Sequence, residues 1–237
     1  MQLGFSAGIN NCGNGSVHTG RVIAISSSGL SESIIGKYLG LFASTEIFVF
    51  VFMEIVTKIE TIQRVMFKKA ELLDYVIFVI LFGLFSVFGT LIGIPDNYGS
   101  ISNIRDIAPI VSGLVAGPYV GLAVGLIGGL YRLTLGGVTG VGCSLATIVA
   151  GLLAGLVYHF RKGKLLGPVW AMLFAAGIEL LHGGIVLLVS RPFDQALEII
   201  IDVIPEMIIA VSLGVGISVI ILHDVINREG PEAMKKE

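Results

Sequence analysis

The hydrophobic positions of this chain come in long, continuous runs. Residues 75–95 form an uncharged run of 21 residues, and residues 107–131 form another of 25, bracketed by Arg105 and Arg132. About 20 apolar residues are enough for an α-helix to cross a bilayer, and continuous runs favour helices over the alternating strands of a barrel. The pattern therefore predicts an all-α fold, a polytopic bundle of transmembrane helices.

The polar segments divide the chain into three parts. Residues 1–35 are rich in glycine, serine and asparagine, and we expect them to form a flexible N-terminal tail. Residues 36–222 are expected to form the transmembrane domain, and residues 223–237 a short cytoplasmic tail. In addition to the stretch from 104 to 131, spans are expected at residues 36–57, 75–95, 140–158, 166–190 and 196–222.

The stretch from 104 to 131 could be one long helix or two short ones broken at Gly117-Pro118. A residue before proline is pushed out of the helical region, which favours a break. Each half would then be about 20 Å long at 1.5 Å per residue. The break brings the total to six to seven membrane helices, and it alone places three basic segments on one side, residues 58–74, 159–165 and the C-terminal tail. The positive-inside rule then predicts an outer N-terminus and a cytoplasmic C-terminus.

Glycine is unusually frequent in the same stretch and recurs at every fourth position. Small residues at this spacing form one stripe on a helix and let two backbones approach closely. We therefore expect the stripe to serve helix packing. Its members are Gly113, Gly117, Gly121, Gly125 and Gly129.

Composition agrees with a multi-pass membrane protein. The chain is 54% hydrophobic and 14% charged, with a mean hydropathy of +0.92, whereas soluble domains are about 25% charged. A net charge of −2 gives no indication of a nucleic-acid partner. Two cysteines cannot define a disulfide framework, and no metal-ligand motif or nucleophile motif occurs. We therefore expect no enzyme, no cofactor and no metal.

Arg105 and Arg132 are expected at the same, outer end of the bundle. Each could be an interfacial anchor whose side chain reaches water. Together, beside glycine-rich backbone, they could instead form an anion site, because a guanidinium binds a carboxylate through two parallel hydrogen bonds. Pairing of Asp106 with Arg105 would argue against such a site.

Two further features lie within the later spans. Glu179 and His182 are three residues apart on one helix face, and could be either a proton-sensitive couple that relays a signal or a buried hydrogen-bonded pair. Pro205 is expected to kink the last helix and to help transmit a ligand-induced shift.

Several segments resemble the membrane region of LytS-type sensor histidine kinases, the five-transmembrane receptor family. The resemblance covers about residues 58 to 222. It rests on NIR, GPYVGLAVGLIGGLYRLTLGG, CSLAT, GLLAGLV, FGLFSVFGTLIGI and IPEMIIAVSLGVGI. The helices after the first are also similar to the substrate-binding subunits of energy-coupling-factor transporters.

This resemblance implies a receptor that reads a small extracellular carboxylate, pyruvate-like in some members, and signals to a cytoplasmic histidine kinase or another output partner. Other members are linked with cell-wall regulation, and a homodimer is compatible with the family. The family pattern places two arginines and a cysteine in the site, matched by Arg105, Arg132 and Cys143. The serine three residues later is replaced by Ala146, so Ser144 or Thr147 would supply the hydroxyl.

The chain also departs from the family by showing no kinase sequence, so it is not expected to phosphorylate anything by itself. Two other functions remain open at this point. One is a small-molecule transport protein or substrate-capture subunit, which would accumulate ligand in vesicles once its partners are supplied. The other is a structural membrane protein that binds no small molecule.

Overall fold

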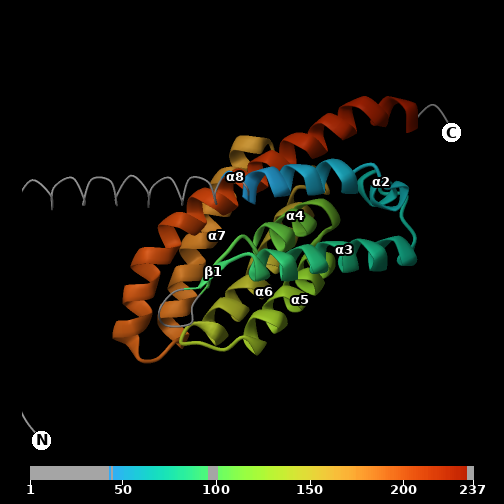
Figure 1. Ribbon diagram of the computed structural model, residues 1–237. Helices are drawn as coiled ribbons and strands as arrows, with labels where there is room; N and C mark the ends of the chain where they lie inside the picture. Colours follow the sequence, from blue (N-terminus) through green and yellow to red (C-terminus); the bar gives the residue numbers. More distant parts are fainter. Residues whose placement is uncertain (1–42, 44, 96–100, 234–237) are drawn as a thin grey trace, which may run out of the picture. The chain divides into compact units, whose positions relative to one another are not determined.

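The computed structural model describes residues 43, 45–95 and 101–233 (Figure 1). Contacts divide the chain into Met1–Ala43 and Ser44–Glu237, and the second unit is the one described below. The tail predicted at residues 1–35 and the beginning of the first predicted span lie outside the described residues.

The unit is a bundle of helices with one very short pair of strands. Residues 45–56 are helical and belong to the first predicted span, residues 36–57. The strands β1 (Ile94–Pro95) and β2 (Ile101–Ser102) pair antiparallel between α3 and α4. The remaining helices are α2 (Glu60–Met66), α3 (Leu72–Leu91), α4 (Ile107–Ala116), α5 (Pro118–Thr134), α6 (Gly140–Phe160), α7 (Pro168–Val189) and α8 (Phe193–Ala233).

Four helices in the described part of the chain are long and apolar enough to cross a membrane. They are α3, α6, α7 and residues Phe193–Arg228 of α8. This confirms the all-α class and a multi-pass membrane protein. The expected number of six to seven membrane helices stays a prediction.

The predicted break in the glycine-rich stretch is present. The helix α4 ends at Ala116, and α5 begins at Pro118. Gly117 between them has φ of +92°, which L-residues with a side chain rarely adopt, and Pro118 is suited to the first position of a helix because it needs no backbone donor there. The helix α4 is about 15 Å long at 1.5 Å per residue, and its residues from Ile107 to Leu114 are all buried.

The glycine stripe packs α4 and α5 against α6, as predicted. A Cβ atom added to Gly129 would lie 2.7 Å from the carbonyl oxygen of Ser144, and one added to Gly113 would lie 2.8 Å from the amide nitrogen of Gly155. Real Cβ atoms essentially never come this close to other atoms. The backbones therefore approach each other at distances that only glycine allows.

The helix at residues 45–56 packs on α3 through phenylalanine rings. Phe52 stacks on Phe85 with ring centroids 4.1 Å apart, and Phe48 lies 4.5 Å from Phe88. The short helix α2 is tied to α3 by Arg64, whose Nη2 lies 2.6 Å from Oδ1 of Asp74. The first segments are thus attached to a bundle whose interior helix is α4.

Candidate functional site

Arg105 and Arg132 are both buried inside the bundle. Arg105 lies in the turn before α4 with a relative exposure of 1%, and Arg132 lies in the last turns of α5 with 0%. An interfacial anchor would extend its charged group to water, so the anchor alternative does not describe either side chain. A buried charge is costly without compensating partners, and the surroundings of each guanidinium therefore decide what it can do.

Among the described residues, only Nε of the Arg105 guanidinium has hydrogen-bond partners. Its Nε donates to Oγ1 of Thr147 at 2.7 Å and lies 3.3 Å from Oδ1 of Asp106. Among the described residues, neither Nη1 nor Nη2 has a hydrogen-bond partner, and both are shielded from the surface. The pairing with Asp106 that argued against an anion site therefore exists, but it leaves the two terminal nitrogens available for a carboxylate.

Small residues create the space that Arg105 occupies. A Cβ atom on Gly89 of α3 would lie 3.1 Å from the Cα of Arg105, and one on Gly128 of α5 would lie 3.5 Å from its Cγ. Ser86 of α3 donates from Oγ to the carbonyl oxygen of Arg105 at 3.2 Å. The arginine is thus positioned by α3, α5 and α6 together.

Arg132 organises the loop between α5 and α6. Its Nη1 donates to the carbonyl oxygen of Gly136 at 2.6 Å, and its Nη2 donates to Oγ1 of Thr139 at 3.4 Å. Gly136 has a positive φ of +69°, a backbone conformation that residues with a side chain rarely adopt. The loop therefore fixes Arg132 close to the beginning of α6, where the other predicted residues lie.

The three predicted residues on α6 differ in what they contact. Thr147 donates from Oγ1 to Oδ1 of Asp106 at 2.7 Å or to the carbonyl oxygen of Cys143 at 3.0 Å, besides accepting from Arg105. Ser144 donates to the carbonyl oxygen of Gly140 in its own helix at 2.7 Å. The Cys143 thiol is unoxidised and interacts electrostatically with His182, Arg105 and Arg132.

Glu179 and His182 of α7 belong to the same cluster. Nδ1 of His182 lies 2.8 Å from Oδ2 of Asp106 and 3.5 Å from Oε2 of Glu179. Glu179 is 0% exposed and His182 is 2% exposed. His182 therefore contacts Asp106, which in turn contacts Arg105 and Thr147, two of the residues expected to bind the ligand.

Asp106 is the central residue that the sequence alone did not identify as functional. It is 0% exposed and connects Arg105, Thr147 and His182 through its two oxygens. Its position directly after Arg105 suggested only local neutralisation. One feature of the sequence could have identified Asp106. A second acid, Glu179, and a histidine, His182, also lie in an apolar run, and buried polar groups of this kind need one another as partners.

Asp106, Glu179 and His182 offer ligand atoms within 4.8 Å of one another, which is close enough to hold a metal ion. The oxygens of Asp106, however, already accept from Arg105, Thr147 and His182. A cation at this position would also lie next to the Arg105 guanidinium. The arrangement is therefore better described as a hydrogen-bond network.

Pro205 lies outside this cluster, on α8. The helix continues through it, and its predicted effect on the helix axis stays a prediction. Its neighbour Ile204 packs on Gly183 of α7, where an added Cβ would lie 3.2 Å from Cγ1 of Ile204. Since Gly183 follows His182 directly, the cluster is one residue away from the contact between α7 and α8.

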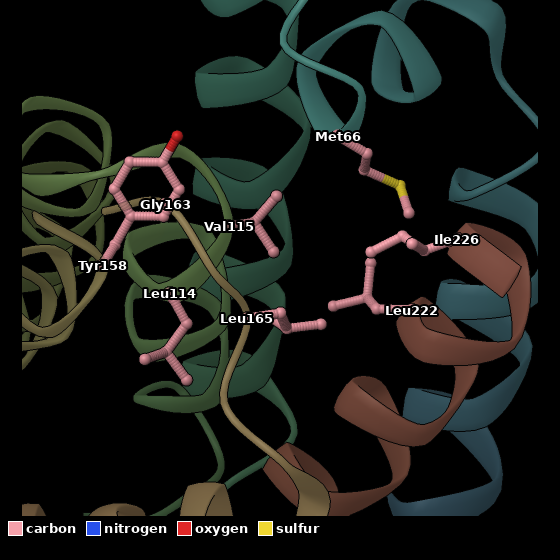
Figure 2. Close-up of a pocket in the computed structure, with 8 residues that line it drawn as sticks. All are labelled: Met66, Leu114, Val115, Tyr158, Gly163, Leu165, Leu222 and Ile226. Atoms are coloured by element: carbon pink, nitrogen blue, oxygen red, sulfur yellow. The ribbon is translucent and has the colours of Figure 1, made fainter. Parts of the chain in front are cut away.

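A separate cavity of about 50 Å³ lies at the other end of α4 (Figure 2). It is too small for a ligand site of ordinary size, which is about 300–1,000 Å³. Its lining side chains are mostly apolar, with Tyr158 as the exception, and come from α2, α4, α6, α8 and the loop after α6. The lining residues are Met66, Leu114, Val115, Tyr158, Gly163, Leu165, Leu222 and Ile226.

Comparison with known proteins gives one family. Residues 59–225 match the family described as the 5TMR of 5TMR-LYT. The sensor histidine kinase BtsS of Escherichia coli K12 is 35% identical over 150 residues, which cover 61% of this chain and 27% of that protein. The sensor protein LytS of Bacillus subtilis 168 is 33% identical over 170 residues, covering 65% of this chain and 29% of the relative.

A third relative, the sensor histidine kinase YpdA of Escherichia coli K12, is 34% identical over 120 residues, or 42% of this chain and 21% of the relative. The chain thus spans less than a third of the length of these curated relatives. No solved structure matches it. The family resemblance drawn from the sequence motifs is confirmed.

Proposed function

This chain belongs to the LytS-type five-transmembrane receptor family, and on that premise we propose that it binds a small carboxylate from outside the cell and signals to a cytoplasmic histidine kinase or another output partner. The pyruvate-like ligand implied by the family resemblance is part of this proposal, as are a homodimer and a role in cell-wall or nutrient regulation. The membrane-sensor role itself follows from the family match over residues 59–225.

The observation that carries the proposed ligand class is the partly satisfied guanidinium of Arg105. Its Nη1 and Nη2 are buried and lack a partner in the described part of the chain, while Nε is already bonded to Thr147. A buried charged donor left without a partner is costly, and a carboxylate supplies two acceptors in the geometry that these nitrogens present. Arg132 adds a second positive charge near the Cys143 thiol.

The proposed orientation places the N-terminus outside and the C-terminus in the cytoplasm, with six to seven membrane helices. The break at Gly117 supports it, because two short helices return the chain to the side from which it entered. The basic segments 58–74 and 159–165 also lie together: Nζ of Lys68 is 5.9 Å from the ring centroid of Tyr158 and lies against Gly163. Positively charged loops are typical of the cytoplasmic side.

The proposed signal path leads from the arginines to α8. Arg105 and Thr147 contact Asp106, Asp106 contacts His182, and the next residue of α7 packs on Ile204 of α8. A ligand that draws Arg105 away from Asp106 would change the contact with His182. We propose that Glu179, His182 and Pro205 carry this change to the last helix, which continues to Ala233.

The test is calorimetric titration of the reconstituted protein with pyruvate and other small mono- and dicarboxylates. Arg105→Gln and Arg132→Gln should each abolish saturable binding. Arg191→Gln is the matched control, because this exposed arginine donates only to the backbone carbonyls of Leu187 and Ser190 among the described residues. Absence of binding to every acid by a folded sample would overturn the proposed ligand class.

A further inference from the structure

Glu179 is a second unsatisfied group in the buried site. Both of its carboxylate oxygens are shielded from the surface, and no donor within residues 45–95 and 101–233 reaches them at hydrogen-bond distance. Nδ1 of His182 lies 3.5 Å from Oε2 of Glu179, and it is already engaged by Asp106 at 2.8 Å. A buried carboxylate without donors is costly, so the site is incomplete at Glu179 as well as at Arg105.

The two incomplete groups face one shared environment. An oxygen of Glu179 and an oxygen of Asp106 lie within 4.8 Å of each other, and Nε of Arg105 lies 3.3 Å from Oδ1 of Asp106. The site therefore offers two free donors on a guanidinium and two free acceptors on a carboxylate, close enough for one small molecule to address both.

Donors for a ligand carbonyl are scarce in the same place. Ala146 has no hydrogen-bond donor in its side chain, and Ser144 gives its hydrogen to the carbonyl oxygen of Gly140. Thr147 gives its hydrogen to Asp106 or to the carbonyl oxygen of Cys143. The Cys143 thiol is a weak donor. A 2-oxo group, which only accepts hydrogen bonds, cannot supply the donor that the Glu179 oxygens lack.

The two unsatisfied groups together favour a ligand that carries both acceptors and a donor. A simple carboxylate would satisfy Nη1 and Nη2 of Arg105 but would leave the Glu179 oxygens without a donor. An ammonium group on the same molecule supplies that donor. We propose that the ligand is a small α-amino acid, whose carboxylate binds Nη1 and Nη2 of Arg105 and whose ammonium group donates to Glu179.

This assignment rests on the proposed carboxylate-receptor function and replaces its pyruvate-like ligand with an α-amino acid. In this assignment, Glu179 distinguishes ligands by the substituent on their α-carbon. A divalent cation is the competing occupant, since Asp106, Glu179 and His182 lie close together. The saturation of Asp106 by Arg105, Thr147 and His182 leaves Glu179 as the one free carboxylate of the set.

The experiment compares four three-carbon acids that differ only at the α-carbon. Alanine, lactate, pyruvate and propionate are titrated into the full chain in lipid nanodiscs, with and without EDTA. Alanine should bind at least tenfold more tightly than pyruvate and propionate, with lactate between, because loss of a hydrogen bond to a charged group costs about tenfold to hundredfold in affinity. Glu179→Gln should weaken alanine binding by at least tenfold and leave pyruvate within threefold.

Asp202→Asn is the matched control, an exposed acid on α8 converted to its amide, and it should change none of the four affinities. If Glu179→Gln does not fold, the order of the four affinities in the wild-type protein tests the amino-acid assignment by itself. Pyruvate or propionate binding as tightly as alanine, still dependent on Arg105, would overturn the amino-acid assignment and leave the proposed function standing. Binding that EDTA abolishes and a divalent cation restores would overturn it too. Failure of all four acids would overturn both.

Discussion

The imidazole of His182 lies 2.8 Å from the carboxylate of Asp106, although the two residues are 76 positions apart in the chain. This contact joins α7 to the turn that begins α4, and both side chains are buried. It also makes Asp106 the point where the Arg105 side and the Glu179 side of the site meet. The consequences can be measured separately for stability and for binding.

Removing Asp106 should destabilise the protein more than removing any other single member of the site. Asp106→Ala leaves the buried Arg105 guanidinium without its counter-charge, and breaking one partner of a buried ion pair typically costs about 3–5 kcal/mol. The isosteric Asp106→Asn should cost less, because its amide oxygen keeps an acceptor for either Thr147 or His182. Thermal unfolding in detergent would measure both variants. An Asp106→Ala protein as stable as the wild type would contradict the central role of this residue.

The two hydroxyl residues on α6 should behave differently. Thr147→Val removes the contact that holds Nε of Arg105 at 2.7 Å, and it should weaken carboxylate binding about tenfold, the usual effect of one lost hydrogen bond to a charged group. Ser144→Ala removes a bond to the helix's own backbone and should change affinity by less than about twofold. Calorimetry on the pair checks this, and equal losses in both variants would contradict the assignment.

The glycine stripe should be intolerant of a single methyl group where it meets α6. Gly129→Ala places a Cβ 2.7 Å from the carbonyl oxygen of Ser144, and overpacking of this kind typically costs about 1–3 kcal/mol. Gly184→Ala on α7 is the matched control, since nothing lies within 4 Å of its added Cβ. It should be neutral or stabilising by up to about 1 kcal/mol, the difference in helix propensity. Unfolding midpoints of the two variants give the comparison.

The cavity between α4 and α8 should accept one more methylene group. Val115→Leu extends a lining side chain into a space of about 50 Å³, and filling a cavity commonly stabilises by about 0.5–2 kcal/mol (Figure 2). Leu222→Ala on the facing helix should enlarge the cavity and destabilise by about 2–5 kcal/mol. Val169→Leu, on an exposed part of α7, serves as the control. Destabilisation by Val115→Leu would mean that the cavity cannot take the added group.

The sequence was sufficient for the features that depend on local pattern. Continuous apolar runs predicted membrane helices, and the Gly117-Pro118 pair predicted the break that separates α4 from α5. The glycine spacing predicted close backbone contacts because that spacing repeats on one face of a helix. The family resemblance drawn from the motifs was also confirmed, because residues 59–225 match the five-transmembrane receptor family.

Features that depend on long-range contacts could not be derived in the same way. The sequence presents Asp106 only as the neighbour of Arg105, and its contacts with Thr147 and His182 arise from the packing of three helices. Ser144 and Thr147 look equivalent until the helix is built, when one hydroxyl bonds its own backbone and the other reaches Arg105. The last helix also continues beyond the apolar run that ends at residue 222, because polar residues after it remain helical.

The length of α8 has a mechanical consequence. Its 41 residues make a rod of about 60 Å at 1.5 Å per residue, twice the thickness of a hydrocarbon core of about 30 Å. The packing of Ile204 on Gly183 lies in the first third of this rod. A tilt of about 5° there would swing the end of the helix, about 40 Å further along at that rise, through about 3–4 Å. On the proposed signal path, a movement of α7 at Gly183 that tilts α8 would therefore be largest at the far end of this helix.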